Sequence, residues 1–325
     1  MSAFIKTVQN TAFTHKLWKR HSKILIGVSG GPDSMCLLHV LFVLSKKYDF
    51  TLHIAHINYG LRKRDSLLDE ELVQKAAIFY NIPLSILRPT ITSRKNLEEH
   101  LRSIRYEFFE NIRKEYDLEY IAVAHNQNDQ AETVLLHLMR GSGLTGLSGM
   151  RYKNKDIIRP FLNIERSSII QFAKENNIAY RLDKSNSKNI FSRNKIRNKL
   201  IPYLEKNFNP AIRKILAHTA ITIGDDYEKL LSLEHHLSLP YQEKEDGLYF
   251  SATDFLLLDI SMQKLALRRL LKQLHGSIRG ITSSHILEMI KLITSTKSKK
   301  KYHSFHTLRL SMQGEQVMIS KDKLT

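Results

Sequence analysis

The stretch Ser29-Gly30-Gly31-Pro32-Asp33-Ser34 lies between the short apolar run Ile24–Val28 and the densely apolar segment Pro32–Leu44. The run has the length of a buried strand, and the segment has the length of a helix. A glycine pair between a strand and a helix lets backbone N–H groups approach a phosphate, and the N-terminus of the helix adds partial positive charge. The stretch therefore predicts a strand–loop–helix unit that binds phosphate.

The side chains of this loop narrow the kind of phosphate site. Ser29 and Ser34 offer hydroxyl groups, whereas Asp33 puts an anion beside the phosphate, which makes sense only with a cation such as Mg²⁺ between them. The loop lacks the Gly-Lys-Ser/Thr of a Walker A loop and the three glycines of a dinucleotide fingerprint. A plain glycine turn with a Ser or Asp helix cap is the alternative, and the full hexapeptide after a strand disfavours it.

Strands and helices alternate through the first half of the chain. Strands are predicted at Ile24–Val28, Leu52–Ile57, Leu84–Leu87 and Tyr120–Ala124, and helices at Pro32–Leu44, Asp65–Tyr80, Asn96–Tyr116 and Asp129–Met139. This alternation predicts an α/β fold with a doubly wound parallel sheet, in which ligands bind at the carboxyl ends of the strands.

The pattern changes after Asn209-Pro210. Amphipathic helices are predicted at Ala211–Leu233, Met262–Leu274 and Ser284–Ile293, and a hairpin at Phe305–Ile319 that turns at Gln313-Gly314-Glu315. We therefore predict two domains, residues 1–215 and a second, mainly helical domain over residues 216–325.

Composition restricts the partners of the protein. The 325 residues include 50 Lys and Arg against 32 Asp and Glu, a formal net charge of +18. Such a charge favours polyphosphate partners, although a lysine-rich proteome would also produce it. One cysteine, Cys36, excludes a disulfide within the chain and argues against a cysteine-based metal site. No run reaches the ~18 apolar residues that a membrane span needs, so we expect a cytoplasmic protein without a membrane partner.

The hexapeptide Ser29–Ser34 resembles the PP-loop of the ATP pyrophosphatase superfamily, which binds the pyrophosphate of ATP and cleaves at the α-phosphate. Further segments, in order along the chain, resemble the tRNA(Ile)-lysidine synthase family. They are His56-Ile57-Asn58-Tyr59-Gly60-Leu61-Arg62, Ala124-His125-Asn126-Gln127-Asn128-Asp129-Gln130-Ala131-Glu132-Thr133, Arg140-Gly141-Ser142-Gly143-Leu144-Thr145-Gly146-Leu147, Asp183-Lys184-Ser185-Asn186 and Phe191-Ser192-Arg193-Asn194-Lys195-Ile196-Arg197.

The resemblance implies a two-step reaction that uses ATP and Mg²⁺. The wobble cytidine of an isoleucine tRNA with a CAU anticodon is adenylated at its C2 oxygen, and the ε-amine of free L-lysine then displaces AMP. Adenylation turns a poor leaving group into a good one, and the lysine amine must lose a proton before it attacks. The oligomeric state is left open, a homodimer included.

The resemblance also implies site residues. Those that bind ATP are Ser29, Gly30, Gly31, Pro32, Asp33, Ser34, Arg62 and His125, with Asp33 as the metal ligand. The catalytic ones are Asp33, Asp129, Glu132, Arg193 and Arg197. Arg193 and Arg197, one helical turn apart, are suited to stabilise charge on the α-phosphate.

For several of these residues, a purely structural role is the alternative to a functional one. Asp129 and Glu132 share one face of a predicted helix and either form a negative pocket for lysine or Mg²⁺ or make a helix cap, with Asp129 at the N-cap. His125 is either a nucleotide contact or a structural histidine. Arg62 contacts adenine or the lysine carboxylate, or is exposed to solvent. Arg193 and Arg197 belong to a basic run that could be a solvated helix face.

Two positions depart from the usual pattern of the family, which often has histidine at the position of Tyr59 and aspartate at that of Asn128. The run formed by Lys297, Lys299, Lys300 and Lys301 is either a set of phosphate contacts or a flexible tail.

Three other functions compete with the one that the resemblance implies. The rivals are a PP-loop enzyme that thiolates tRNA, which a single cysteine disfavours, an amidotransferase-type relative, and a non-catalytic RNA-binding protein.

Overall fold

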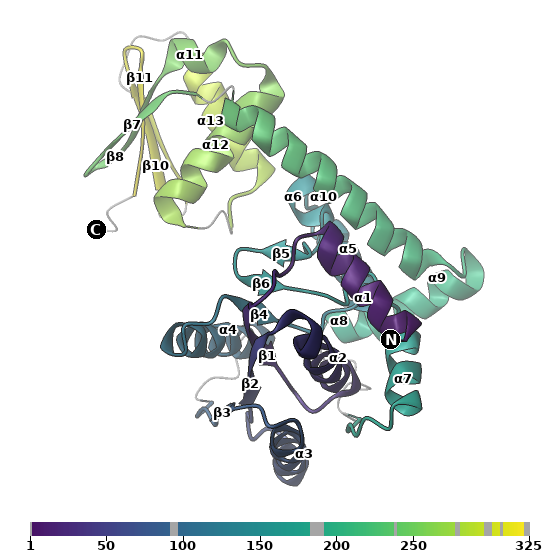
Figure 1. The fold of residues 1–325 in the computed structure, drawn as a ribbon. Coiled ribbons are helices and arrows are strands. Elements are labelled where there is room, and N and C mark those ends of the chain that lie inside the picture. Colours follow the sequence, from purple (N-terminus) through teal and green to yellow (C-terminus); the bar gives the residue numbers. More distant parts are fainter. Residues whose placement is uncertain are drawn as a thin grey trace. The chain divides into compact units, whose positions relative to one another are not determined.

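The structure is a computed structural model that describes residues 2–91, 97–182, 192–236, 239–276, 280–295, 301–305 and 308–321 (Figure 1). It divides into two compact units, Met1–Asp225 and Asp226–Thr325. The division lies beyond the predicted position, residue 215. The reason is that one helix, α10 (Ile212–His236), runs through the division without a break, so no change of sequence pattern marks the boundary.

The first unit is built on a six-stranded sheet in the order β3-β2-β1-β4-β6-β5. Its strands are β1 (Lys23–Gly27), β2 (Thr51–Ile57), β3 (Leu84–Leu87), β4 (Tyr120–Ala122), β5 (Lys153–Asn154) and β6 (Ile157–Ile158). All pairs are parallel except β5 with β6. The predicted doubly wound parallel sheet is therefore confirmed.

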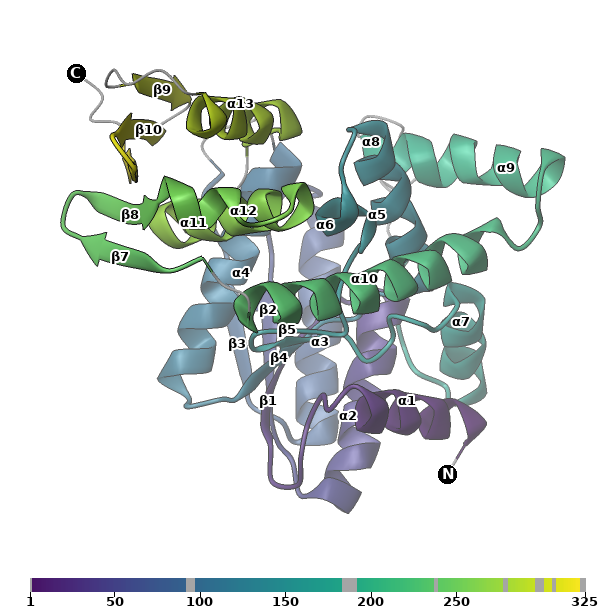
Figure 2. The same ribbon diagram turned by 90° about the horizontal axis from the view of Figure 1, so that it is seen from above.

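The helices of the first unit are α1 (Ala3–Thr14), α2 (Pro32–Tyr48), α3 (Arg64–Tyr80), α4 (Leu97–Glu115), α5 (Gln127–Met139), α6 (Leu144–Leu147), α7 (Arg166–Glu175), α8 (Ser192–Lys195), the π-helical turn η2 (Ile196–Leu200) and α9 (Ile201–Asn207). Both α8 and η2 pack against α5, and Figure 2 shows α8 beside α5.

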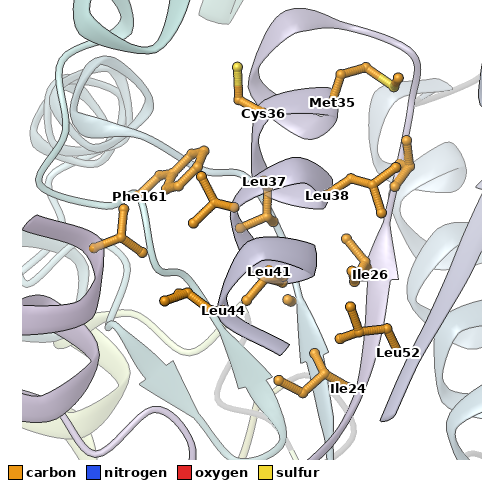
Figure 3. Packing of buried hydrophobic residues seen from close by; sticks show 14 of the residues in the cluster. Ile24, Ile26, Met35, Cys36, Leu37, Leu38, Leu41, Leu44, Leu52 and Phe161 are labelled. Carbon is orange, nitrogen blue, oxygen red and sulfur yellow. The ribbon is translucent and has the colours of Figure 1, made fainter. Parts of the chain in front are cut away.

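The central strand β1 is buried on both faces because helices cover both sides of the sheet. Successive side chains of a strand point to opposite faces. Ile24 and Ile26 belong to a core cluster with α1, α2, α3 and α7, whereas Leu25 belongs to a second cluster with α4. Figure 3 shows Ile24 and Ile26 beside the row of leucines on α2. This packing fixes β1, and with it the loop that follows.

The strand order places two loops side by side. From β1 the chain proceeds to β2 and β3 in one direction, and β4 then pairs with the other side of β1. The loop after β1 and the loop after β4 therefore meet at the topological switch point, where open α/β sheets bind their ligands.

The second unit combines helices with a five-stranded antiparallel sheet in the order β7-β8-β11-β10-β9. Its elements are β7 (Tyr241–Lys244), β8 (Gly247–Ser251), α11 (Ala252–Leu256), α12 (Ile260–His275), α13 (Ser283–Thr294), β9 (Lys301–Phe305), β10 (Leu308–Gln313) and β11 (Gln316–Lys321). The predicted hairpin is confirmed as β10–β11. The prediction of a mainly helical domain is incomplete, because β7 is short and polar and carries no apolar alternation. Among the described residues, every helix is too short or too polar to cross a bilayer.

Candidate active site

The loop after β1 is held closed by its own serines. The Ser34 hydroxyl accepts from the Ser29 backbone N–H at 3.1 Å and donates to the Gly31 carbonyl at 3.1 Å, and the two hydroxyl oxygens lie 3.1 Å apart. Gly30 has φ +84°, and a Cβ there would lie 3.3 Å from the Cβ of Asp69. Both hydroxyls therefore shape the loop, and the backbone N–H groups that open α2 have the chemistry to bind a phosphate.

A cavity of about 240 Å³ adjoins this loop. Its apolar walls come from the strand ends, with Ala55, Ile57 and Val123, and from Phe109 of α4. Gly27 allows the Phe109 ring to approach, because a Cβ on Gly27 would lie 2.7 Å from that ring. A cavity with apolar walls and a phosphate-binding loop at its edge suits a nucleotide.

Asn126 connects the two loops at the switch point. Its side-chain N–H₂ donates to Asp33 Oδ1 at 2.8 Å, and Arg166 Nε lies 3.5 Å from Asp33 Oδ2. Burial raises the pKa of Asp33, and the nearby Asp129 adds to the rise, while Arg166 opposes it. The Asp33 carboxylate is thus incompletely compensated, which suits it to a cation.

Asn126 is also the N-cap of α5. Its side-chain oxygen accepts from the backbone N–H groups of Asn128 and Asp129, and Asp129 Oδ2 accepts from the Asn126 N–H at 3.1 Å. This is a capping box. The prediction of Asp129 as the N-cap is wrong, because α5 begins at Gln127, two residues earlier than expected, and Asn126 caps it there.

Glu132 is fully buried between two arginines. Its oxygens accept from Arg193 Nε at 2.8 Å, from Arg197 Nε at 2.5 Å and from an Arg197 terminal nitrogen at 2.9 Å. Asp129 Oδ1 accepts from the same two guanidinium groups at 3.3 and 3.1 Å. We call these four side chains the carboxylate–arginine cluster. Burial favours the neutral form of Asp129, but the guanidinium groups of Arg193 and Arg197 outweigh burial and lower the pKa of Asp129.

The carboxylate–arginine cluster changes the interpretation of Glu132. Two carboxylates face two guanidinium groups, so the cluster is close to electrically neutral. Both oxygens of Glu132 are already engaged. The geometry therefore favours Glu132 as the residue that orients Arg193 and Arg197 over a direct ligand of a lysine ammonium group.

His125 lines the cavity and is neutral. Its Nδ1 accepts from Arg159 Nε at 3.3 Å, and burial lowers the pKa of His125 to about 3. A guanidinium group only donates, so the ring proton of His125 is on Nε2. Arg159 itself is 4 % exposed and donates to the Arg151 carbonyl at 2.8 Å.

Arg62 is not among the residues that line the cavity. It donates to Asp69 at 2.7 Å, and Arg181 donates to the other oxygen of Asp69 at 2.8 Å. The Arg181 backbone N–H donates to the Gly30 carbonyl at 3.0 Å. Arg62 thus belongs to an ion-pair network that supports the glycine loop from behind.

Several side chains of the site were not singled out from the sequence. They are Arg105, Tyr106 and Phe109 on α4, Asn126 at the start of α5, and Arg159 and Arg166. Asn126 could have been found, because an Asn between a strand and an apolar helix is typical of an N-cap. Arg105 offered no signal, since it lies on a helix with many other charged residues.

Some predictions fall outside the described residues. These are the segment Asp183–Asn186, Phe191, and Lys297, Lys299 and Lys300; Lys301 begins β9, but its side chain is not described. Cys36 is buried, and burial raises the pKa of its thiol to about 12. It therefore acts as a small apolar core residue.

Comparisons with known proteins agree with this geometry. The family model described as the PP-loop domain matches residues 3–204. The tRNA(Ile)-lysidine synthase of Clostridioides difficile (strain 630) is 34% identical over 305 residues, which cover 90% of this chain and 65% of that protein. The tRNA(Ile)-lysidine synthase of Caldanaerobacter subterraneus subsp. tengcongensis is 32% identical over 323 residues, covering 98% and 69%. The chain belongs to the tRNA(Ile)-lysidine synthase family.

Membership of this family confirms the predicted resemblance and the use of ATP by a PP-loop domain. The chain spans about two thirds of the length of these two curated relatives. Among solved structures, the U34-tRNA thiolase NcsA from Methanococcus maripaludis with its [4Fe-4S] cluster is similar, with a TM-score of 0.54 and 20% identity over 70% of this chain and 78% of that one. This likeness supports the fold alone.

Proposed function

We propose that the chain is a ligase of the cytoplasm that joins free L-lysine to the wobble cytidine of an isoleucine tRNA with a CAU anticodon, at the expense of ATP. The observation that carries the proposal is the junction at the ends of β1 and β4. There Asn126 links Asp33 of the PP-loop to Asp129, and Asp129 shares Arg193 and Arg197 with Glu132. This geometry occurs in a chain that belongs to the tRNA(Ile)-lysidine synthase family.

In the first step, the C2 oxygen of the cytidine attacks the α-phosphorus of ATP and the bond to the β-phosphate oxygen breaks. The backbone N–H groups of the PP-loop hold the departing pyrophosphate. Arg193 and Arg197 counter the charge on the α-phosphate, and they do so efficiently because Glu132 and Asp129 fix their positions beforehand.

In the second step, the ε-amine of lysine attacks C2 and AMP leaves with the former C2 oxygen. The ammonium form of lysine must first be drawn in and then lose a proton. Asp129 has a lowered pKa, so it suits the first task better than the second.

Mg²⁺ fits this donor set in one way. No group of three or more His, Cys, Asp or Glu side chains suited to a metal occurs among the described residues. Mg²⁺ commonly uses one or two carboxylates together with substrate phosphates and water. Asp33, an incompletely compensated carboxylate beside the PP-loop, would hold such an ion, which would neutralise phosphate charge.

The alternative hypothesis, a PP-loop enzyme that thiolates tRNA, is disfavoured by the state of the cysteine. A thiolase needs a reactive sulfur, and the one cysteine of the chain is buried in the core with a raised pKa. The formal net charge of +18 fits tRNA as the partner, and we propose that the second unit, Asp226–Thr325, contributes tRNA contacts.

The test is product analysis. The protein is incubated with ATP, lysine and an isoleucine tRNA transcript that carries the CAU anticodon, and the digested tRNA is analysed by mass spectrometry. We expect a cytidine that has gained lysine with loss of water, and AMP release that requires both tRNA and lysine. AMP release without tRNA, or transfer of sulfur to the tRNA, would refute the proposal.

A further inference from the structure

A groove of about 700 Å³ lies beside α5 in the first unit. Its walls come from the end of α5, from η2 and from the start of α9. The residues that line it are Leu136, Met139, Arg140, Lys195, Ile196, Lys199, Leu200 and Tyr203. We call it the α5–α9 groove; none of these residues lines the nucleotide cavity at the PP-loop.

The π-helical turn η2 gives this groove its connection to the active site. The N–H of Ile201 donates to the Ile196 carbonyl, and Pro202, which follows, has no N–H to donate. Lys195 and Lys199 are four residues apart and line the groove. Arg197 lies midway between them in sequence, and its side chain reaches Glu132 instead. The groove and the carboxylate–arginine cluster thus flank one helical turn, whose diameter is about 10 Å.

The chemistry of the groove combines exposed apolar surface with positive charge. Ile196 and Leu200 form apolar wall, and Met139 and Tyr203 are 58 % and 56 % exposed. The cationic side chains are Arg140, Lys195 and Lys199, all exposed. No acidic side chain is among the described residues that line the groove.

This combination matches one class of ligand. Proteins bind single-stranded nucleic acid with basic side chains along the backbone and with aromatic side chains on which bases stack. A neutral lipid or an apolar peptide would use the apolar wall but would not need three cations on one short groove. A second copy of the chain would bring another +18 of formal charge against those cations.

We propose that the α5–α9 groove binds the unpaired nucleotides that flank the target cytidine, with Tyr203 stacked on a base and with Lys195 and Lys199 on the adjacent phosphates. The inference rests on the proposed function, because it takes the substrate to be a tRNA loop. It adds a specificity subsite on the face of η2 opposite Arg197.

The experiment measures RNA affinity apart from catalysis. Fluorescence anisotropy follows the binding of a short single-stranded RNA of anticodon-loop sequence, and of the same RNA with abasic sites, to the full chain. The variants are Tyr203→Ala, Tyr203→Phe and the pair Lys195→Ala with Lys199→Ala. The controls are Phe13→Ala, an aromatic residue that is 86 % exposed outside the groove, and Lys174→Ala on α7.

Tyr203→Ala is expected to weaken binding of the RNA about five- to a hundredfold, the range for loss of one stacked base. Tyr203→Phe keeps the ring and should bind like the parent. The lysine pair should reduce the slope of log K against log salt by up to about 1.4, or ~0.7 per phosphate contact. The abasic RNA should not distinguish Tyr203→Ala from the parent. Both control variants should bind the RNA like the parent, and the groove variants should keep the parent's affinity for ATP.

The outcomes separate this inference from the proposed function. Unchanged RNA affinity in Tyr203→Ala, or an equal loss with the abasic RNA, would overturn the groove as a base-binding site. A parent dimer that dissociates on Tyr203→Ala, with RNA affinity unchanged, would assign the groove to self-association instead. If the RNA effects appear but no lysine is incorporated, the groove stands and the proposed reaction fails.

Discussion

Replacing Glu132 with Gln tests the carboxylate–arginine cluster most directly. Gln has nearly the same size, but it loses the charge and puts an N–H₂ group where a carboxylate oxygen stood. Glu132 now accepts three hydrogen bonds from Arg193 and Arg197 at 2.5 to 2.9 Å, and its side chain is 0 % exposed. In the variant, at least one of these donors faces another donor, in a place that water does not reach.

The expected loss of stability is large. Removing one partner of a buried ion pair costs about 3–5 kcal/mol, because the remaining charge stays buried without compensation. For a unit of this size, 1 kcal/mol corresponds to roughly 2–4 °C in Tm. We therefore expect Glu132→Gln to lower the Tm of the first unit by about 6–20 °C.

Tryptophan fluorescence can follow this unit alone. Trp18 is the one tryptophan of the chain, and it lies in the first unit with its ring 5.6 Å from that of Phe50. The matched control is Glu205→Gln, since Glu205 accepts from Arg213 at 2.6 Å but is 29 % exposed. A pair that reaches solvent contributes about 0–1 kcal/mol, so this control should shift Tm by no more than ~4 °C.

The same variant separates the two roles considered for Glu132. If Glu132 orients Arg193 and Arg197, then adenylation of tRNA and lysine incorporation should fall together in the folded fraction. Each step is measured separately: trapped adenylate without lysine, and modified tRNA with lysine. A variant with the stability of the control, normal adenylation and impaired lysine incorporation would refute the reasoning and make Glu132 a lysine ligand.

Three further changes have defined outcomes. Asp33→Asn should leave the Tm nearly unchanged, because the side-chain oxygen of Asn can still accept the hydrogen bond from Asn126 and because burial, which raises the pKa of Asp33, already disfavours its charged form. The same variant should abolish pyrophosphate release, and release at a near-normal rate would contradict the metal role. Gly30→Ala should weaken ATP binding, since φ +84° is strained for alanine and Asp69 lies behind it; calorimetric titration with ATP would detect unchanged affinity if this is wrong. The pKa of His125 is 6.5 in the unfolded chain and about 3 in the folded one, so the unfolded chain binds more protons and the unfolding free energy decreases as the pH falls from 6.5 toward 3. His125→Gln should make this decrease shallower. If urea titrations at several pH values give the same dependence of the unfolding free energy on pH in the variant and the parent, His125 titrates normally.

The sequence predicted what local patterns encode. The apolar runs that became β1 to β4 and the helices between them are long or regular enough to be recognised, and Leu84–Leu87 was located to the residue. The boundary of α5 was misplaced because Gln127 and Asn128 are polar and do not extend the apolar periodicity. Short strands such as Lys153–Asn154 exist only through their pairing with Ile157–Ile158, so no local signal marks them.

The site depends on contacts between distant segments. The hydrogen bond from Asn126 to Asp33 requires that β1 and β4 be neighbours, a fact of strand order and not of either segment. The resemblance named Arg193 and Arg197 as site residues, but it gave no reason to pair them with Glu132, more than 60 positions earlier. Buried arginines such as Arg159 are harder still to predict, because the sequence around them does not differ from the sequence around an exposed arginine.

The burial of Glu132 also indicates what the carboxylate–arginine cluster is for. Taking a carboxylate and two guanidinium groups out of water costs several kcal/mol per ion, and apolar residues of similar volume often replace such groups without loss of stability. The carboxylate–arginine cluster is therefore a poor way to stabilise the fold. It is a good way to hold two guanidinium groups at fixed positions, and the charge of Arg197 interacts with that of Asp33, near which the α-phosphate charge would develop. Because Arg197 lies on the same turn as Lys195 and Lys199, any shift of η2 on binding RNA would move that guanidinium as well. Rigid attachment to a fully buried Glu132 is what would keep the position of Arg197 independent of the RNA bound on the other face.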